Sequence, residues 1–365
     1  MRQGNERLTF HSLNGLRGVA AVAVVNAHLQ AYCSGYFSHN VGLVVDFFFV
    51  LSGFVIAHAY ERQLRDGLGA MRFMTARFVR LYPLYLVGLL LGATIFWLNW
   101  LWGGVPAFFT SLGMGLLMLP PPSSMSSNYY NLFPLNFAAW SLFYELIANF
   151  AFALLATRLT NRVLGIIIAL AFGGLVLVGL DVGTLDQGVR PFQIPGGVAR
   201  VMFSFFAGVA LYRLWQVRPV RFVVPPVVLF VFLILPLLFK PAGQMEWIYD
   251  LAVISLYFPA LILVGAQSRG GKFWTWVCAT LGALSYPLYV LHVPMWNALK
   301  AYYDEPLKAM APLSGLLMVV AFATIAWGMD AFFDYPLRRR LSRRLVHRPT
   351  SAGAPEINVE ARAAF

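Results

Sequence analysis

The chain has 365 residues, of which 59% are hydrophobic and 12% charged, with a formal net charge of +12 and a mean hydropathy of +0.69. A soluble domain carries about 25% charged residues, so the composition excludes an ordinary soluble protein and indicates an all-α, polytopic membrane bundle. The apolar runs leave no room for a separate soluble domain of normal size. The first run continues into a full span without a small-residue cleavage site, so we expect no cleaved signal peptide.

A membrane-spanning helix needs about 20 apolar residues, and on this basis the sequence predicts about ten spans. They cover residues 12–32, 41–60, 80–102, 137–158, 163–181, 197–216, 222–239, 248–267, 276–298 and 312–335. Residues 105–119 are apolar but short, which favours a re-entrant or interfacial helix. Residues 120–136 are rich in Pro, Ser and Asn and carry no charge, which is typical of a loop.

The distribution of basic residues predicts that both termini lie in the cytoplasm, because inner segments of membrane proteins are enriched in Lys and Arg. Two of the 27 Lys and Arg residues lie within spans and most of the others lie in inner segments; the predicted outer segments contain only Arg190, Lys240, Lys300 and Lys308. This asymmetry explains the positive charge without a nucleic-acid partner. Residues 8–345 are predicted to form one transmembrane domain, followed by a disordered cytoplasmic tail at 346–365. We expect the arginines around its start to meet anionic lipid headgroups.

Ionisable side chains interrupt the first two apolar stretches. Arg17 and His28 lie eleven residues apart in the first stretch, which places them on one helical face about 16 Å apart along the axis. Asp46 lies in the second stretch at a depth similar to that of His28. A buried charge costs several kcal/mol unless it is paired or faces a cavity, so these residues are candidates for function. We expect Asp46 to orient His28 as a general base. The alternative is that His28 only hydrogen-bonds a neighbouring helix.

Later spans add further polar candidates at related depths. Glu145 lies in the fourth predicted span; its alternative role is a salt bridge to Arg17 or Arg200. Ser285, Tyr286 and His292 all lie in the ninth predicted span, around a helix-kinking proline. For His292, an interfacial histidine without a catalytic role is an equal alternative.

The third predicted span opens with Arg77 and Arg80, which lie three residues apart and therefore on one helical face. Guanidinium groups bind phosphates well, so these arginines are candidates for an anionic substrate. The alternative is ordinary anchoring at the inner membrane surface. The sequence contains no metal-binding motif, and we expect no metal site.

Six sequence elements, in order along residues 8–345, resemble motifs of the membrane acyltransferase-3 family. They are LNGLRGVAAVAVVNAHL, with Arg17 and His28 separated by ten residues, and DFFFVLSGFVI, RFVRLYP, WSLFYEL, SYPLYVLH and DYPLRRR. The last element begins at Asp334, where the family often has Glu, so an acid is retained.

The resemblance implies a ten-helix enzyme of the bacterial inner (cell) membrane. Such an enzyme moves an acyl group, often acetyl, from cytoplasmic acyl-CoA to a hydroxyl of a cell-surface or exported glycan. It further implies that acyl-CoA is a co-substrate rather than a bound cofactor, and that the partners are acyl-CoA, a glycan or lipid-linked glycan, and membrane lipids. The roles carried over are catalytic for His28, Arg17, Asp46 and Glu145, acyl-CoA binding for Arg77 and Arg80, and acceptor binding or support for Trp140, Ser141, Ser285, Tyr286 and His292.

Two other classes of function remain open from the sequence. A proton-coupled transporter would use His28, Asp46 and Glu145 as a proton relay, and its activity would not require CoA. A scaffolding subunit of a polysaccharide assembly complex would tolerate loss of His28, whereas the enzyme would not.

Overall fold

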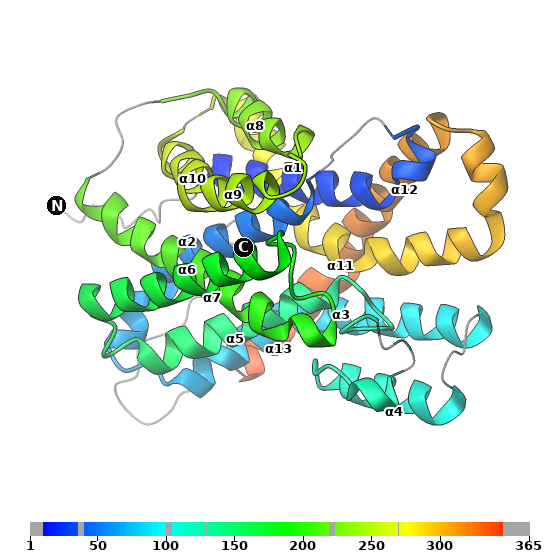
Figure 1. The fold of residues 1–365 in the computed structure, drawn as a ribbon, viewed down its shortest axis with the longest axis horizontal. Coiled ribbons are helices and arrows are strands. Elements are labelled where there is room, and N and C mark those ends of the chain that lie inside the picture. Colours follow the sequence, from blue (N-terminus) through cyan, green and yellow to red (C-terminus); the bar gives the residue numbers. More distant parts are fainter. Residues whose placement is uncertain are drawn as a thin grey trace.

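The computed structural model describes residues 10–35, 40–99, 104–126, 128, 130–218, 223–268 and 270–345. Over these residues the protein is built from helices without any β-strand, which confirms the predicted all-α fold class (Figure 1). Residues 8 and 9 of the predicted domain and the predicted tail at 346–365 lie outside the described residues.

Each predicted span overlaps one helix or two consecutive helices of the described residues. The central ones are α1 (His11–His28), α2 (Gly42–Arg65), α3 (Ala70–Asn99), α5 (Ala139–Leu155), α7 (Ile194–Val217) and α11 (Lys272–Ala309). The others are α6 (Asn161–Val182), α8 (Pro226–Ile234), α9 (Met245–Ala252), α10 (Phe258–Gln267), α12 (Leu313–Met329) and α13 (Tyr335–Leu345). One π-helical turn joins α9 to α10 and another joins α12 to α13.

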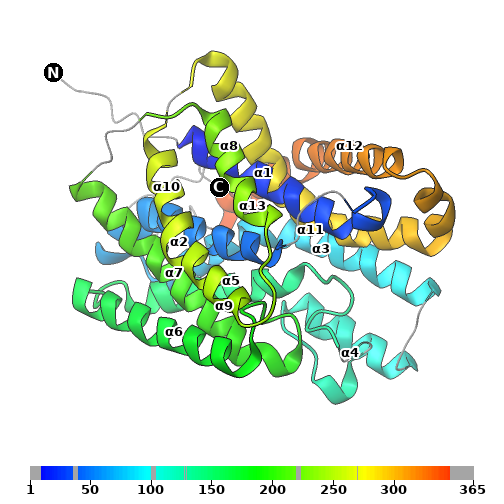
Figure 2. The ribbon, with the colours of Figure 1, turned by 45° about the horizontal axis from the view of Figure 1, so that its top comes forward.

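Seven helical segments of the described chain are long and apolar enough to cross a membrane. They are α2, α3, α6, α7, α9 with α10, α11, and α12 with α13, whereas α1, α5 and α8 are not among them. The predicted short helix at 105–119 is α4 (Gly104–Leu116). It lies beside α3 (Figure 2), where Tyr82 and Tyr85 of α3 donate hydrogen bonds to the carbonyls of Leu116 and Gly115.

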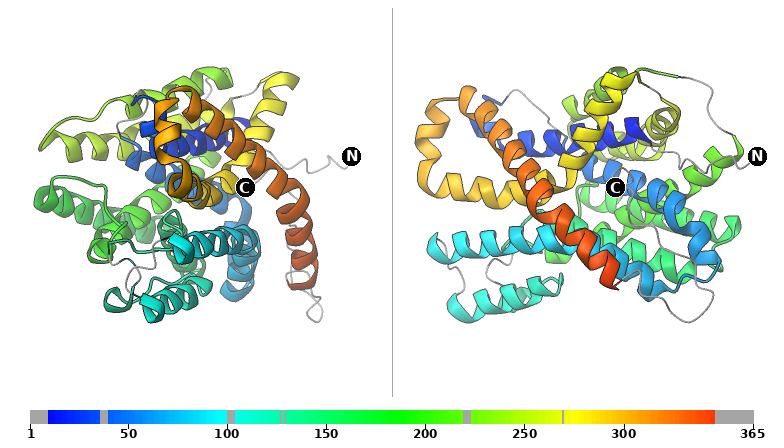
Figure 3. Two further views of the ribbon diagram at one scale, coloured as in Figure 1. Left: turned by 90° about the vertical axis from the view of Figure 1, so that its right-hand side faces the viewer. Right: turned by 180° about the vertical axis from the view of Figure 1, so that it is seen from behind.

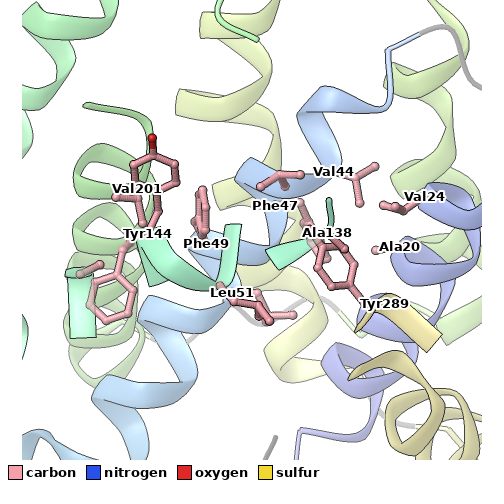
Figure 4. Packing of buried hydrophobic residues seen from close by; sticks show 14 of the residues in the cluster. Ala20, Val24, Val44, Phe47, Phe49, Leu51, Ala138, Tyr144, Val201 and Tyr289 are labelled. Carbon is pink, nitrogen blue, oxygen red and sulfur yellow. The ribbon is translucent and has the colours of Figure 1, made fainter. Parts of the chain in front are cut away.

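Central and peripheral helices differ in how much of their surface is buried. In the most apolar windows of α2, α3, α7 and α11, 56 to 67% of the residues are buried, against 17% in α6 and in the α12–α13 segment. Helix α12 crosses one side of the bundle diagonally (Figure 3). The core consists of aliphatic and aromatic side chains between the central helices, including Val24, Val44, Phe47 and Tyr289 (Figure 4). The peripheral helices therefore present apolar side chains outward, as a surface in contact with lipid does.

Helices α2 and α7 cross at two glycines that leave no room for a side chain. A Cβ atom on Gly53 would lie 1.9 Å from the Phe205 carbonyl oxygen, and one on Gly208 would lie 2.0 Å from the Val50 carbonyl oxygen. Small residues of this kind allow helices in membranes to approach closely. The contact fixes the rotation of α2, and with it the direction in which the polar residues of α2 point.

A proline and an asparagine shape α11 close to His292. Pro294 has no N–H group, so the Val290 carbonyl one turn earlier lacks its usual helical donor. Asn136 supplies a donor instead, because its side-chain amide lies 3.1 Å from the Val290 oxygen. The buried Asn136 thus ties the segment before α5 to the part of α11 that carries His292.

We predict that Gly208→Ala lowers the stability of the protein. The added methyl group overlaps the main chain of α2, and overpacking of this kind costs about 1–3 kcal/mol. Thermal unfolding of the purified protein in detergent measures the effect. Gly173→Ala in α6 is the matched control, since nothing lies within 4 Å of a Cβ atom there. Equal stability of the two variants would contradict the close crossing.

Candidate active site

Five central helices enclose a cavity with an empty volume of about 750 Å³, counting the space at its mouth. Helix α1 contributes Arg17, and the other walls come from α2, α3, α5 and α11. Polar lining residues are unusually frequent for the interior of an apolar bundle; they are Arg17, Ser52, Arg77, Arg80, Ser141, Glu145, Ser285, Tyr286 and Tyr289. The cavity therefore unites seven of the residues singled out from the sequence.

Arg17 is held by neutral groups of α11. Its Nε atom donates to Ser285 Oγ at 2.8 Å, and its Nη2 atom donates to the Gly282 carbonyl at 2.9 Å. Within the described parts of the chain, no carboxylate forms an ion pair with Arg17. A guanidinium in an apolar bundle normally has an anionic partner. Arg17 thus leaves the cavity with a positive charge that an anionic ligand can balance.

Glu145 forms an ion pair with Arg77. The alternative stated from the sequence, a salt bridge to Arg17 or Arg200, is not observed in the described part of the chain. Arg77 Nη2 lies 2.8 Å from Glu145 Oε1, which also accepts a hydrogen bond of 2.9 Å from Ser52. The Arg77 side chain is only 5% exposed. These contacts connect α3, α5 and α2 on one wall of the cavity. Glu145 therefore positions Arg77 and lowers the net positive charge of the wall.

Arg80 connects the cavity to the start of α13. Its guanidinium lies 3.8 Å from the buried carboxylate of Asp334 and 5.3 Å from the centre of the Tyr286 ring. Asp334 also forms an ion pair of 2.6 Å with Arg338, whose side chain pairs with Asp330 as well. The predicted pair Arg77 and Arg80 thus lines one cavity, but each guanidinium also has an acidic neighbour.

His28 and His292 lie side by side, with ring centroids 4.9 Å apart. The Nδ1 atom of His28 lies 2.9 Å from the Val24 carbonyl oxygen, and that of His292 lies 2.7 Å from the Tyr289 carbonyl oxygen. A carbonyl oxygen only accepts hydrogen bonds, so Nδ1 carries the proton in both rings. In a neutral imidazole this leaves the lone pair on Nε2. Each histidine therefore presents a basic Nε2 atom.

Aromatic residues connect the histidine pair to the cavity. Tyr289 lines the cavity, lies 5.9 Å from His292 between ring centroids, and shares a 2.6 Å hydrogen bond with Ser141. The rings of Phe137 and Trp296 lie 6.0 and 5.9 Å from the His28 ring. Figure 4 shows Tyr289 beside Ala138, near Ala20 and Val24 of α1. Tyr289 therefore contacts both the cavity and His292.

The expected partnership of Asp46 with His28 is wrong. The Asp46 carboxylate accepts bonds of 2.7 and 3.3 Å from Arg200, and Ser204 lies 3.3 Å from it. Both side chains of the Asp46–Arg200 pair are at most 2% exposed. Arg200 also contacts the carbonyls of Gln187 and Gly42, and its guanidinium lies 5.7 Å from the Trp140 ring. Asp46 and Trp140 thus belong to a separate buried cluster.

The rotation of α2 explains this correction. Val45, Phe48 and Ser52 line the cavity at the three- and four-residue spacing of one helical face. Asp46 lies on the face that carries Gly53, which packs against α7. Asp46 therefore lies in the predicted helix, but its side chain points in another direction around the helix axis than the prediction requires.

Sequence reasoning missed three residues that shape the site. Ser52 hydrogen-bonds Glu145, Tyr289 lines the cavity, and Trp296 flanks His28. The spacing of Tyr289 and His292, three residues apart in one helix, was the available signal, because it places both side chains on neighbouring positions of one face.

Because Asp46 forms a buried ion pair with Arg200, we predict that Asp46→Asn lowers the stability of the protein. The substitution leaves the Arg200 charge buried without its main partner, and the loss of one member of a buried pair costs about 3–5 kcal/mol. Unfolding in detergent should show this loss directly. Asp186→Asn is the control, because this second carboxylate near Arg200 is 53% exposed and an exposed pair contributes about 1 kcal/mol or less. A stable, inactive Asp46→Asn protein would instead favour a catalytic carboxylate.

Comparison with known proteins places these observations in a family. The model of the acyltransferase-3 family, described as an acyltransferase domain, matches residues 10–330. Protein 2 in the picA locus of Rhizobium radiobacter is 38% identical over 177 residues, which is 44% of this chain and 90% of that protein.

Proteins of Staphylococcus aureus strains COL and MSSA476, named for an inferred O-acetyltransferase activity, are each 25% identical over 378 residues. The alignment covers 93% of this chain but only 59% of each S. aureus protein. No solved structure matches the chain. Because the family model spans most of the chain and the helices are apolar, the protein is a membrane acyltransferase that belongs to the acyltransferase-3 family.

Proposed function

We propose that the protein transfers an acyl group, in the first instance acetyl, from cytoplasmic acyl-CoA to a hydroxyl group of a cell-surface or exported glycan. The proposal includes ten spans, both termini in the cytoplasm and a location in the bacterial inner membrane. The observation that carries it is Arg17, which forms no ion pair with a carboxylate in the described structure and lines a cavity. Tyr289, another lining residue of this cavity, lies beside His292, the neighbour of His28. The names of the S. aureus relatives support the acetyl group.

The arginines give the cavity the character of a site for an anionic donor. Arg17, Arg77 and Arg80 line it together with one carboxylate, that of Glu145, so its charge is positive. Guanidinium groups form two parallel hydrogen bonds with phosphate oxygens, and in an apolar environment such charge-assisted bonds are strong. We propose that they hold the phosphates of acyl-CoA, with the thioester directed towards Tyr289 and the histidines.

His28 can perform the transfer as a base and then as an acid. Its Nε2 lone pair takes the proton of the acceptor hydroxyl as the hydroxyl oxygen forms a bond to the thioester carbonyl carbon. The bond from that carbon to sulfur then breaks, and the Nε2 proton passes to the departing thiolate. In a covalent variant Nε2 itself takes the acyl group and passes it on. Both routes need the tautomer that the Val24 carbonyl fixes.

The transporter alternative is weakened by the positions of the two acids. Asp46 is paired with Arg200 and Glu145 with Arg77, so neither carboxylate contacts His28. A relay through all three residues would need ionisable groups in sequence along one path. The observed contacts instead separate them into three groups.

We predict that Arg17→Gln weakens the use of acetyl-CoA. Loss of a hydrogen bond to a charged group costs about 1.5–3 kcal/mol, which raises KM for acetyl-CoA roughly tenfold or more. Proteoliposomes that contain the purified protein, radiolabelled acetyl-CoA and membrane glycan provide the assay. Arg62→Gln is the control for general charge, because the Arg62 side chain is 94% exposed. Equal effects of the two changes would remove Arg17 from the donor site.

We predict that His28→Ala abolishes acetyl transfer while acetyl-CoA still binds. A general base contributes about 10²- to 10⁴-fold to a rate, and no carboxylate contacts His28 that could replace it in the described structure. Initial rates and equilibrium binding of acetyl-CoA are measured on the same preparation. Transfer at a normal rate by well-folded His28→Ala protein would assign the chemistry to another residue.

A further inference from the structure

His292 combines complete burial with an unused hydrogen-bonding atom. The residue is 1% exposed, its Nδ1 atom is bonded to the Tyr289 carbonyl, and its buried Nε2 atom has no hydrogen-bond partner in the structure. Buried polar atoms are nearly always partnered, and an exception calls for an explanation such as a role in catalysis. The lone pair on this Nε2 atom can only accept a proton or a hydrogen bond.

The neighbours of His292 limit which group can donate a hydrogen bond to its Nε2 atom. Among the described residues of other helices, His28 of α1 is the one titratable group that interacts electrostatically with His292. On α11 itself, the titratable neighbour of His292 is Tyr289. Trp296 lies beside His28, and the Lys300 ammonium lies 5.1 Å from the centre of the Trp296 ring. Asp46, the carboxylate expected from the sequence, is held by Arg200. The partner available to His292 Nε2 from the protein is therefore the His28 ring.

We propose that His292 is a positioning residue that accepts a hydrogen bond from His28 when His28 carries the proton taken from the acceptor hydroxyl. This inference rests on the proposed function, and it gives His292 the part that sequence reasoning gave to Asp46. During transfer the O–H bond of the acceptor breaks and an N–H bond forms at His28 Nε2. Because Nδ1 is tied to Val24, this single N–H is shared in a three-centre hydrogen bond between the former hydroxyl oxygen and His292 Nε2 until its proton passes to the CoA thiolate. His292 itself gains no proton and ends each cycle unchanged.

Two substitutions separate this role from simple packing. His292→Asn retains an amide donor near the position of Nδ1, and so the bond to Tyr289, but it has no atom at the position of Nε2. His292→Gln places its terminal amide near the position of Nε2, where the oxygen can accept a hydrogen bond, and it does not titrate. We expect kcat to fall at least tenfold in His292→Asn and to stay within about threefold of the native value in His292→Gln.

The pH dependence gives a readout that packing alone would not change. His28 must be unprotonated to accept the hydroxyl proton, and the bond to His292 stabilises its protonated form. In His292→Asn this stabilisation is lost, so the acidic limb of the kcat/KM profile moves to lower pH, by about one unit if the bond contributes ~1.4 kcal/mol. Equal kcat values in the two variants, or an acidic limb that stays in place, would overturn the proposal.

Two further measurements keep the outcomes distinct. Acetyl-CoA binding by both variants establishes that they are folded, and a native protein that shows no CoA-dependent transfer would refute the proposed function rather than the role of His292.

If neither variant folds, ¹⁵N NMR of histidine-labelled native protein in membranes tests the shared proton. We expect the Nε2 signals of His28 and His292 to shift together as the pH falls. Independent titration of the two rings would overturn the proposal.

Discussion

An unpaired charge inside an apolar bundle costs free energy. The ionisable residues of the chain can therefore be divided into those that form ion pairs and those that do not. Several form ion pairs: Asp46 with Arg200 between α2 and α7, and Asp334 with Arg80 of α3 and Arg338 of α13. These pairs hold the helices in register. Arg17 at the cavity and the two histidines form no ion pair in the described structure. The same holds for the buried Asp250, which accepts a hydrogen bond from the neutral Asn40. Of these residues, Arg17, His28 and His292 are the ones to which we assign binding and chemistry.

Much of the fold and part of the site could be predicted from the sequence. Apolar length located the helices, and helical rise placed Arg17 and His28 on one face, where both contact α11. Rotation of a helix about its axis is set by contacts with distant segments, such as Gly53 against Gly208, and the pattern within one helix does not contain it. This is why Asp46 could be assigned to the correct helix and yet to the wrong partner.

The same limit explains why the histidine pair was not predicted as a pair. His28 and His292 are separated by most of the chain, and only the parallel contact between α1 and α11 brings their rings to 4.9 Å. Each alone was compatible with a role in packing. Together, with both Nδ1 protons fixed by main-chain carbonyls, they form a neutral site with two basic nitrogens. A carboxylate is thus not needed to fix the tautomer of His28.

The central claim is that acyl-CoA enters the arginine-lined cavity and presents its acyl group to His28. Electron cryomicroscopy of the protein in lipid nanodiscs, with an unreactive thioether analogue of acetyl-CoA, tests this directly. The account predicts phosphate groups in contact with Arg17 and Arg80, and the acyl end of the analogue next to Tyr289 and His28. An analogue bound outside the cavity, or with its acyl end directed away from His28, would contradict it.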